Sequence, residues 1–268
     1  MNHVAPQRPL AVVTGASTGI GFALARQFAE RGYDLVIAAD EPEIRDAADR
    51  LGESGSRVVA AQADLATERG VEDLHETIVG TGRPVTAAAF NAGVGSSGQF
   101  FTTPLEADLQ VVDLNVRSVV HLSKLVLPSM VDRGEGRLLF TASIAGLGPG
   151  PNQATYAASK AFVHLFAEAL RHELRGTGVT VTSLMPGPTD TPFFDRADMR
   201  DTRLGQMPKD APDRVAREAY EAMMAGKDRV VSGTVLNRVQ AVGSVFLPDR
   251  VKAFAQAFLT KPQSWSGH

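Results

Sequence analysis

The 268-residue sequence predicts an α/β protein in which one doubly wound parallel sheet carries helices on both faces. Three observations predict this class. Short unbroken apolar runs alternate with longer segments of helical periodicity, as expected for buried parallel strands and their crossover helices. A glycine-rich segment at 14–21 lies between the first apolar run and the first helical segment. No internal repeat or linker divides the sequence, so we expect a single domain over residues 1–268.

Each expected element follows from the apolar pattern, taken from the N-terminus onwards. Strands are predicted at 10–13, 33–39, 57–61, 85–90, 137–141 and 179–184, with a candidate seventh strand at 229–233. Helices are predicted around 20–29, 43–51, 71–78, 105–131 and 153–175. Right-handed crossovers then place the ligand crevice at the carboxyl ends of the strands, as in Rossmann-type sheets.

The segment Thr14-Gly15-Ala16-Ser17-Thr18-Gly19-Ile20-Gly21 predicts an anion site, because a strand, a glycine turn and a helix N-terminus follow one another. Gly15 lets the turn close, Gly19 lets a pyrophosphate approach the backbone, and Gly21 lets the helix pack closely on the strand. The spacing is Gly-x-x-x-Gly-x-Gly and not the commoner Gly-x-Gly-x-x-Gly. Three glycines also occur in ordinary turns, so the hypothesis needs support from residues further along the chain.

Tyr156 and Lys160 are four residues apart in the predicted 153–175 helix, so their side chains share one face. A free phenol has a pKa of about 10, and an adjacent ammonium lowers it toward the range useful for acid–base catalysis. Ser143 follows the fifth predicted strand, where crevice residues are expected, and its hydroxyl is suited to hold a carbonyl oxygen beside the tyrosine. The alternatives are a surface tyrosine beside a solvated lysine, and an ordinary loop serine or helix cap.

Composition and charge exclude several classes of function. The sequence has 27 Lys and Arg against 30 Asp and Glu, a formal net charge of −3, and no basic block that would indicate a nucleic-acid partner. It has no cysteine, and its 6 histidines show no metal-ligand spacing, so we expect no disulfide and no metal site. No apolar run approaches the ~20 residues that span a bilayer, and 1–9 lacks a secretory signal. We therefore expect a cytoplasmic protein with a small-molecule substrate.

Together, these residues resemble the short-chain dehydrogenase/reductase family in its compact, non-extended branch. The resemblance covers 10–191 and is carried by the glycine segment, Asn91-Ala92-Gly93, Asn115, Ser143, Tyr156-x-x-x-Lys160 and Pro186-Gly187. It implies hydride transfer between a nicotinamide dinucleotide and an alcohol or carbonyl compound. It further implies that Tyr156 donates or accepts the proton, that Lys160 lowers its pKa and binds the ribose, and that Ser143 orients the substrate oxygen.

The resemblance also assigns residues to the proton relay and to the cofactor. Asn115 would lie in the relay behind Lys160. The implied cofactor contacts are Gly15, Ser17, Thr18, Gly19, Ile20, Gly21, Asp40, Asp64, Leu65, Asn91, Ala92, Gly93, Tyr156, Lys160, Pro186, Gly187, Thr189 and Thr191. The alternative is a non-catalytic dinucleotide-sensing or scaffold protein of the same fold, which has no need for Asn115, Ser143, Tyr156 and Lys160 together.

The choice of cofactor depends on the end of the second predicted strand. An acid there accepts the adenosine ribose hydroxyls of NAD and repels the 2′-phosphate of NADP. Asp40 and Glu41 stand at this point, and position 18 is Thr and not a basic residue, so NAD(H) is favoured. If the strand ends one residue earlier, Ala39 takes the key place and Arg45 reaches a 2′-phosphate, so NADP(H) stays open as the alternative.

The segment at 188–212 is rich in Pro, Asp and Arg, and the resemblance implies a mobile loop at this position that closes over the substrate. The predicted substrate contacts are Ser143, Gln153, Tyr156, Phe193 and Phe194, with Met199, Leu204 and Met207 as further apolar contacts. A merely solvated connection is the alternative. Few charges are expected in the pocket, which favours an apolar alcohol or ketone whose identity the sequence does not reveal.

The C-terminal segment at 234–268 departs from the family pattern. An apolar stripe with helical spacing is formed by Val251, Phe254, Ala255, Phe258 and Leu259, flanked by Arg250, Lys252 and Lys261. The first interpretation is a helix docked on its own core or on a subunit. The alternative is an apolar lid, or a weak contact with a membrane surface that serves a lipophilic substrate.

Apolar residues spread over more than one face of the 105–131 and 153–175 helices, which predicts a homodimer or homotetramer with the Tyr156 helix near the interface. In the first helix we expect Leu109, Val112, Val116, Val119 and Val120 to face the sheet. The rest of its surface then carries Leu114, Leu122, Leu125 and Val126. The divergent C-terminal segment interferes with a second pairing in a tetramer, so a dimer is the safer prediction.

Overall fold

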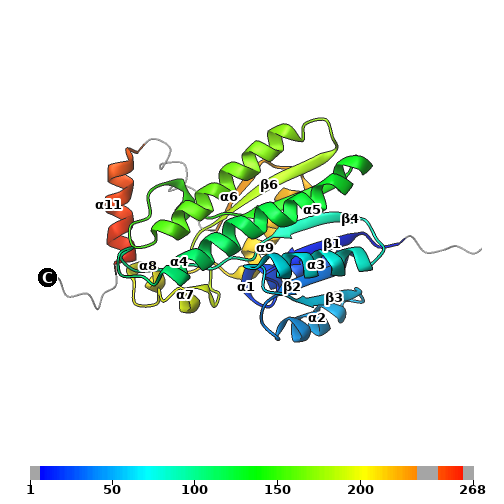
Figure 1. Cartoon of the computed structure of the whole chain (residues 1–268), viewed down its shortest axis with the longest axis horizontal. Helices are drawn as coiled ribbons and strands as arrows, with labels where there is room; N and C mark the ends of the chain where they lie inside the picture. The colour runs from blue at the N-terminus through cyan, green and yellow to red at the C-terminus, as the bar shows by residue number, and fades with distance from the viewer. Residues whose placement is uncertain (1–6, 234–246, 262–268) are drawn as a thin grey trace, which may run out of the picture.

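The computed structural model describes residues 7–233 and 247–261 and contains a seven-stranded parallel sheet (Figure 1). The strands are β1 Leu10–Thr14, β2 Asp34–Ala39, β3 Val58–Gln62, β4 Val85–Phe90, β5 Gly136–Thr141, β6 Val179–Pro186 and β7 Arg229–Ser232. Their order is β3-β2-β1-β4-β5-β6-β7, so the chain winds outward from β1 to one edge and then from β4 to the other. The predicted doubly wound α/β fold is confirmed, and the candidate seventh strand is present.

Helices cover both faces of this sheet (Figure 1). One face carries α3 Glu68–Gly80, α5 Ser118–Arg133 and α6 Ala154–Glu173, and the other carries α1 Gly19–Glu30, α2 Ile44–Gly52 and α9 Pro212–Met224. Successive side chains of a strand point to opposite faces. Thus Val12 and Val36 enter one apolar core, while Val13 and Ile37 enter the other. Burial on both faces explains why the strands are continuous apolar runs in the sequence.

The predicted 105–131 helix contains a π-helical turn. Helix α4, Leu105–Val112, passes through the π turn at Asp113–Arg117 into α5. An extra residue in one turn rotates the following residues by ~100° about the helix axis relative to uninterrupted α-helical spacing. The predicted orientation of this helix is wrong in part. The π turn moves Leu109 and Val112 off the buried face of Val119, whereas Leu122 and Val126 share that face through ordinary helical spacing. Leu109 and Val112 are 49% and 41% exposed, whereas Leu122 and Val126 are buried.

The segments that follow the strands gather at the carboxyl edge of the sheet. After β6, the chain forms a loop that contains the short helices α7, Phe193–Arg196, and α8, Arg203–Gln206. The ends of this loop are joined, because the Asp190 N–H donates to the Asp210 carbonyl and the Asp210 N–H donates to the Pro188 carbonyl, both at 2.9 Å. Helix α11, Asp249–Thr260, lies beyond the sheet beside α8 (Figure 1).

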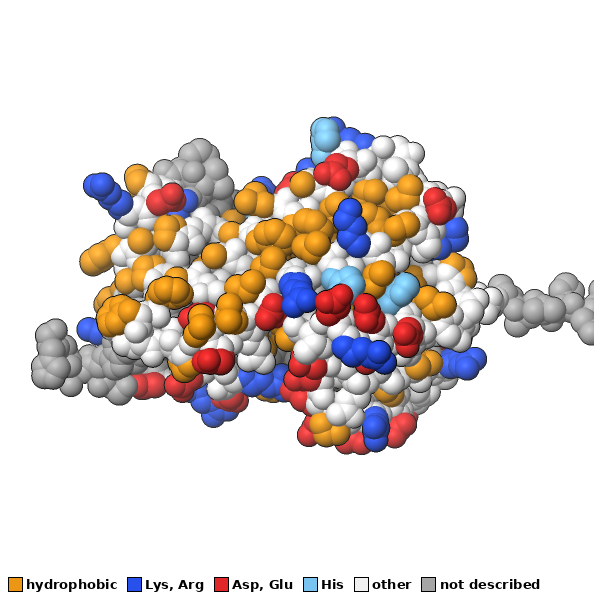
Figure 2. All heavy atoms as spheres, in the orientation of Figure 1, with side chains coloured by type: hydrophobic (Ala, Val, Ile, Leu, Met, Phe, Trp, Pro, Cys, Tyr) orange, Lys and Arg blue, Asp and Glu red, His pale blue; other side chains and the backbone are white. Residues whose placement is uncertain are grey.

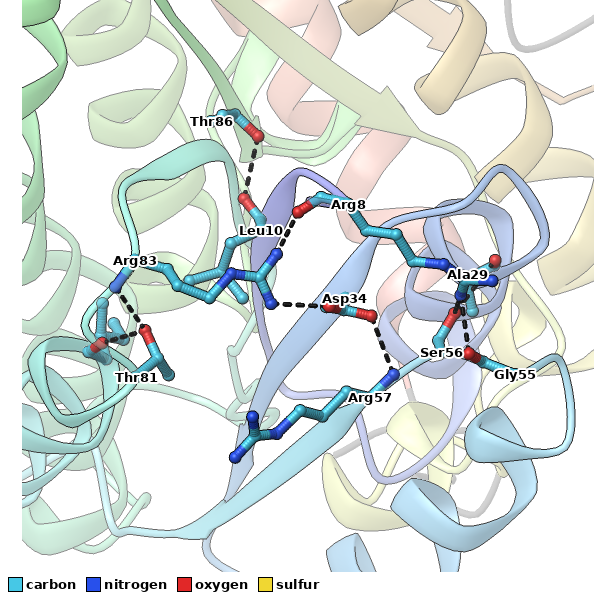
Figure 3. A network of polar contacts seen from close by, with 11 residues as sticks. Arg8, Leu10, Ala29, Asp34, Gly55, Ser56, Arg57, Thr81, Arg83 and Thr86 are labelled. Carbon is cyan, nitrogen blue, oxygen red and sulfur yellow. Dashed lines mark hydrogen bonds and ion pairs between the residues drawn. The ribbon is translucent and has the colours of Figure 1, made fainter. Parts of the chain in front are cut away.

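The amino edge of the sheet is held by a network of charged and backbone groups (Figure 3). Asp34, the first residue of β2, accepts a hydrogen bond from the Arg83 guanidinium at 2.6 Å and from the Arg57 backbone N–H at 2.9 Å. Arg83 also donates to the Arg8 carbonyl, and the Arg8 side chain donates to the Gly55 carbonyl at 2.7 Å. The network therefore ties together the segments that enter β1, β2, β3 and β4.

We predicted a divergent C-terminal segment at 234–268. The structure describes residues 247–261 of it, which include α11, whereas 234–246 and 262–268 lie outside the described ranges. Within those ranges, none of the helices has the length and apolar character needed to cross a membrane.

Candidate active site

The glycine turn between β1 and α1 is shaped to receive an anion. Gly15 and Gly19 adopt φ values of +64° and +59°, a region that favours glycine. A Cβ at Gly15 would lie 2.8 Å from the Ala92 Cα, so the turn packs directly on the end of β4. Thr18, the N-cap of α1, makes no side-chain cap hydrogen bond, and the first turn of α1 has no acidic residue. The helix N-terminus is therefore open to a negatively charged ligand, and the residues present fit a dinucleotide diphosphate.

Side chains at the ends of β1, β4 and β5 hold this turn in place. The Thr14 hydroxyl accepts hydrogen bonds from the backbone N–H groups of Asn91 and Ala92, at 2.9 and 3.0 Å. The Asn91 amide donates to the Gly15 carbonyl at 3.3 Å and accepts from the Thr141 hydroxyl at 3.2 Å. Asn91 therefore links the glycine turn to the neighbouring strand ends, and Thr14 was not among the predicted site residues.

Tyr156, Ser143 and Lys160 come together where β5 ends against α6. All three side chains are buried, and the Ser143 hydroxyl is hydrogen-bonded to the Tyr156 phenol. The Lys160 Nζ donates to the Thr141 carbonyl at 2.9 Å and lies 5.9 Å from the centre of the Tyr156 ring. The alternatives of a surface tyrosine and a solvated lysine are thereby excluded.

Burial shifts both titratable groups. It raises the pKa of Tyr156 to about 12, although the hydrogen bond with Ser143 acts in the opposite direction. Burial also lowers the pKa of Lys160 to about 8. The expected lowering of the tyrosine pKa by Lys160 is therefore not found in this structure, because desolvation of the phenol dominates. At neutral pH the phenol keeps its proton and most of the lysine is charged.

Asn115 lies behind these residues, in the π turn. Its side-chain oxygen accepts from the Val94 backbone N–H at 2.9 Å, and its amide donates to the Val94 carbonyl and to the Ser159 hydroxyl, each at 2.9 Å. A Cβ at Gly93 would lie 3.0 Å from the Asn115 oxygen and 3.1 Å from the Lys160 Nζ. Asn115 and Lys160 thus both lie against the point where a side chain at position 93 would begin, so a residue larger than glycine would displace one of them.

A cavity of about 420 Å³ joins the glycine turn to Tyr156 and continues to the 188–212 loop. All predicted catalytic, cofactor and substrate residues line it except Gly21, which packs against Gly15 and Asn91, and Asn115. Strand β2 ends at Ala39, so Asp40 is the first residue after the strand and lies on the cavity wall. The Asp64 carboxylate accepts from the Ala66 backbone N–H at 3.0 Å, while Leu65 is buried and also lines the wall.

The substrate end of the cavity is packed by apolar side chains from the 188–212 loop. The Phe193 and Tyr156 rings lie 5.3 Å apart between centroids, and Phe194 is buried. The Gln153 amide contacts the buried Met199 sulfur at 2.6 Å. The wall carries five charged residues, and none of them comes from α8 or α11: Asp40, Glu41, Asp64, Lys160 and Arg196.

Two parts of the wall were not among the predicted site residues, although Glu41 had been considered for the choice of cofactor. Glu41 accepts a hydrogen bond from the Ser17 hydroxyl at 2.6 Å and forms an ion pair with Arg196 of α7, so the substrate loop reaches the glycine turn. Gln256 and Leu259 of α11 also line the cavity. The Leu259 position in the apolar stripe was visible in the sequence. Its contact with the cavity that Tyr156 lines, from a position far along the chain, was not visible, because it depends on how α11 docks.

Comparisons with known proteins show which family the sequence belongs to. The sequence matches the family described as short chain dehydrogenase over residues 9–201. It is 37% identical over 227 residues to 1-deoxy-11-beta-hydroxypentalenate dehydrogenase of Streptomyces exfoliatus, which covers 83% of this chain and 82% of the relative. It is 34% identical over 187 residues to sulfoacetaldehyde reductase 2 of Chromohalobacter salexigens, covering 69% of this chain and 74% of the relative.

Solved structures show the same similarity. A short-chain dehydrogenase from Sphingobium yanoikuyae in complex with NADPH superposes with a TM-score of 0.79 at 29% identity, covering 88% of this chain and 93% of that one. The prediction of an enzyme is confirmed over that of a non-catalytic protein. This chain belongs to the short-chain dehydrogenase/reductase family, and it is an NAD(P)-dependent oxidoreductase that transfers a hydride between the dinucleotide and an alcohol or carbonyl substrate.

Proposed function

We propose that this enzyme interconverts an uncharged, largely apolar alcohol and its carbonyl compound, with NAD(H) as the preferred cofactor. The observation that carries the proposal is that acidic and apolar side chains line different parts of the cavity wall. The three acids, Asp40, Glu41 and Asp64, all follow β2 or β3, whereas the substrate end is built from the Phe, Met and Leu residues of the loop and α11.

Tyr156 and Ser143 would hold the oxygen at which the reaction occurs. A bound nicotinamide supplies or accepts the hydride at the adjacent carbon. In reduction, the Tyr156 phenol donates its proton to the carbonyl oxygen while the Ser143 hydroxyl holds the same oxygen. Because burial keeps the phenol protonated, Tyr156 is in the form that donates a proton in reduction. Oxidation requires the phenol to lose its proton first, with the Lys160 ammonium as the nearby positive charge.

Asn115 would act as a positioning residue. It fixes the Val94 backbone through two hydrogen bonds and thereby fixes Gly93, which packs beside the Lys160 Nζ. Lys160 is held by the Thr141 carbonyl at a site where its ammonium can bind the nicotinamide ribose. These contacts support the predicted relay arrangement without placing Asn115 on the cavity wall.

The predicted preference for NAD(H) is supported by Asp40, which follows β2 directly and lies on the cavity wall. A carboxylate there repels a 2′-phosphate and accepts ribose hydroxyls. Arg45 donates to the Gln62 side chain at 3.3 Å and does not line the cavity, so the arginine considered for a 2′-phosphate is directed elsewhere. Two solved relatives bind NADPH, including L-sorbose reductase of Gluconobacter frateurii at 25% identity, so the preference needs a direct test.

The test of the proposed function is steady-state turnover with NADH and with NADPH on matched ketones. One set is apolar and neutral, and the other carries a carboxylate or several hydroxyls at the same distance from the carbonyl. We expect kcat/KM to be at least about tenfold higher for the apolar set, since burying a charge in an apolar site without a partner is costly. Equal or better turnover of the charged or polyhydroxylated ketones would overturn the substrate class, and higher kcat/KM with NADPH would overturn the cofactor preference.

The same fold presents a surface suited to a second copy of the chain. Exposed apolar side chains lie along α4 and α6: Leu105, Leu109, Val112, Phe162 and Leu165 (Figure 2). Helix α6 also carries Tyr156, so the predicted homodimer would place the active site near its interface. Sedimentation at micromolar concentration should show a dimer in the wild type and a monomer in Leu165→Arg. A monomeric wild type would overturn this assembly.

The cytoplasmic location stays a prediction.

A further inference from the structure

Helix α11 leaves an apolar face uncovered although its other face is docked. The Thr260 hydroxyl donates to the Pro151 carbonyl at 2.8 Å, the Arg203 guanidinium donates to the Phe258 carbonyl at 3.1 Å, and Leu259 lines the cavity. On the outer side, Val251, Phe254 and Phe258 are 48%, 79% and 57% exposed. The predicted stripe is therefore divided, and docking on the core does not account for its aromatic residues.

A second element extends this face. The turn at 99–103 carries Phe100 and Phe101, which are 67% and 83% exposed. The turn is fixed, because the Gly98 N–H donates to the Asn152 carbonyl at 2.9 Å and the Thr103 hydroxyl donates to Asp108 at 2.8 Å. The Asn152 side chain in turn donates to Thr260 at 3.3 Å. We call the six exposed residues the distal apolar surface: Phe100, Phe101, Leu247, Val251, Phe254 and Phe258.

The charges on and next to α11 are mostly positive, although the chain as a whole is acidic. Helix α11 carries Arg250, Lys252 and Lys261 against Asp249, and Asp249 receives the Lys252 ammonium at 3.0 Å. Arg203 lies 4.1 Å from the centre of the Phe258 ring. Two copies of α11 that paired through this face would bring cations at both ends of the helix near cations of the other copy, which disfavours self-association here.

We propose that the distal apolar surface docks on an anionic lipid bilayer, with α11 in the interfacial plane. Aromatic side chains on one face of a helix with flanking basic residues are the combination that partitions into the headgroup region. The surface lies at the end of the molecule, where Figure 2 shows a second group of apolar side chains. Because Gln256 and Leu259 on the opposite side of α11 line the cavity, docking would bring the cavity close to the lipid. Uptake of substrate from the bilayer would require the apolar substrate that we propose above. Docking on the bilayer does not depend on that proposed function.

The test is co-flotation of the full-length protein with vesicles of phosphatidylglycerol and phosphatidylcholine, compared with vesicles of phosphatidylcholine alone. We expect the wild type to float with the anionic vesicles and to be released by high salt, since exposed charges are screened. Phe101→Ser combined with Phe254→Ser should lower the partition coefficient at least about tenfold, because two aromatic side chains no longer enter the lipid. Val79→Ser is the matched control, since Val79 is a 61% exposed apolar residue on α3.

Arg250→Glu combined with Lys261→Glu provides a second measurement that does not depend on the aromatic residues. It should abolish flotation with the anionic vesicles, because both exposed cations become acids. Turnover of a water-soluble ketone by either double variant should equal that of the wild type, which separates loss of docking from failure of the proposed function. Wild-type protein that stays unbound on both vesicle types would overturn the proposal. Flotation of the phenylalanine variant equal to that of the wild type would also overturn it, and a simultaneous shift of this variant from dimer to monomer would instead assign the surface to subunit contact.

Discussion

Asp34 and Asp40 stand at opposite ends of the same strand, β2, and their environments differ completely. Asp34, at the amino edge of the sheet, is nearly buried and is bound by Arg83 and the Arg57 backbone. Asp40, at the carboxyl edge, is exposed on the cavity wall, and within residues 7–233 and 247–261 no hydrogen bond or ion pair to its carboxylate is found. A polar group already satisfied by the protein contributes to stability. A polar group left open at the edge of a cavity is available to a ligand.

The difference extends to the whole of both edges. At the amino edge, Arg8, Asp34 and Arg83 satisfy one another and the carbonyls of neighbouring segments (Figure 3). At the carboxyl edge, the Tyr156 phenol and the N-terminus of α1 face the cavity. We therefore expect substitutions at the carboxyl edge to change catalysis with little change in stability, and substitutions at the amino edge to do the reverse.

Tyr156→Phe should have the largest effect on catalysis. The variant keeps the ring packed beside Phe193 and removes only the hydroxyl proposed to give the proton, so turnover should fall by ~10²-fold or more. NADH binding, measured by fluorescence titration, and the free energy of unfolding should stay close to wild type. Near-normal turnover would show that another group supplies the proton.

Asp34→Asn should have the largest effect on stability. Removing the carboxylate leaves the nearly buried Arg83 cation without its counter-charge, so the free energy of unfolding in urea should fall by about 2 kcal/mol. Turnover per folded molecule should not change. A double variant, Asp34→Asn with Arg83→Gln, should lose less than the sum of the two single changes.

The contribution of Asp34 should also depend on pH. Burial by itself would raise the pKa of Asp34, but the hydrogen bonds from Arg57 and Arg83 outweigh it and hold the pKa below its ordinary value. The carboxylate therefore stabilises the fold at neutral pH, and this contribution is lost as the pH falls through the folded-state pKa. Wild type and Asp34→Asn should converge in stability in acid, and a constant difference between them down to low pH would contradict this assignment.

Asp40→Ser should shift the cofactor preference toward NADPH by roughly tenfold in the ratio of kcat/KM values, because the carboxylate no longer repels a 2′-phosphate. Its free energy of unfolding should match wild type, in contrast to Asp34→Asn. If wild type and variant show the same ratio, Asp40 does not contact the adenosine ribose.

The smallest change to be resolved is in the shape of the pH profile, which we compare between wild type and the residual activity of Lys160→Arg. Since burial lowers the pKa of Lys160 to about 8, wild-type kcat/KM for NADH should decline above that pH as the ammonium loses its proton. A guanidinium stays protonated throughout this range, so the residual activity of the variant should lack the decline. A decline at the same pH in both enzymes would assign it to another group.

Much of this protein follows from its sequence. Continuous apolar strands require burial on both faces, and their alternation with helical segments leads to the parallel sheet. The glycine spacing at 14–21 and the shared face of Tyr156 and Lys160 are local properties, because they depend only on neighbouring residues in one turn or one helix. For this reason the reaction class and the predicted catalytic residues were accessible without coordinates.

Other features were decided only by contacts between distant segments. The π turn at Asn115 forms where the side chain meets Val94 and Ser159, and it rotates α5 by about 100° relative to α4. Desolvation of Tyr156 and the docking of α11 likewise depend on packing between elements far apart in the chain. Periodicity describes one segment at a time, so it located the apolar stripe of α11. Only the tertiary structure determined that Leu259 faces the cavity while Phe254 faces outward.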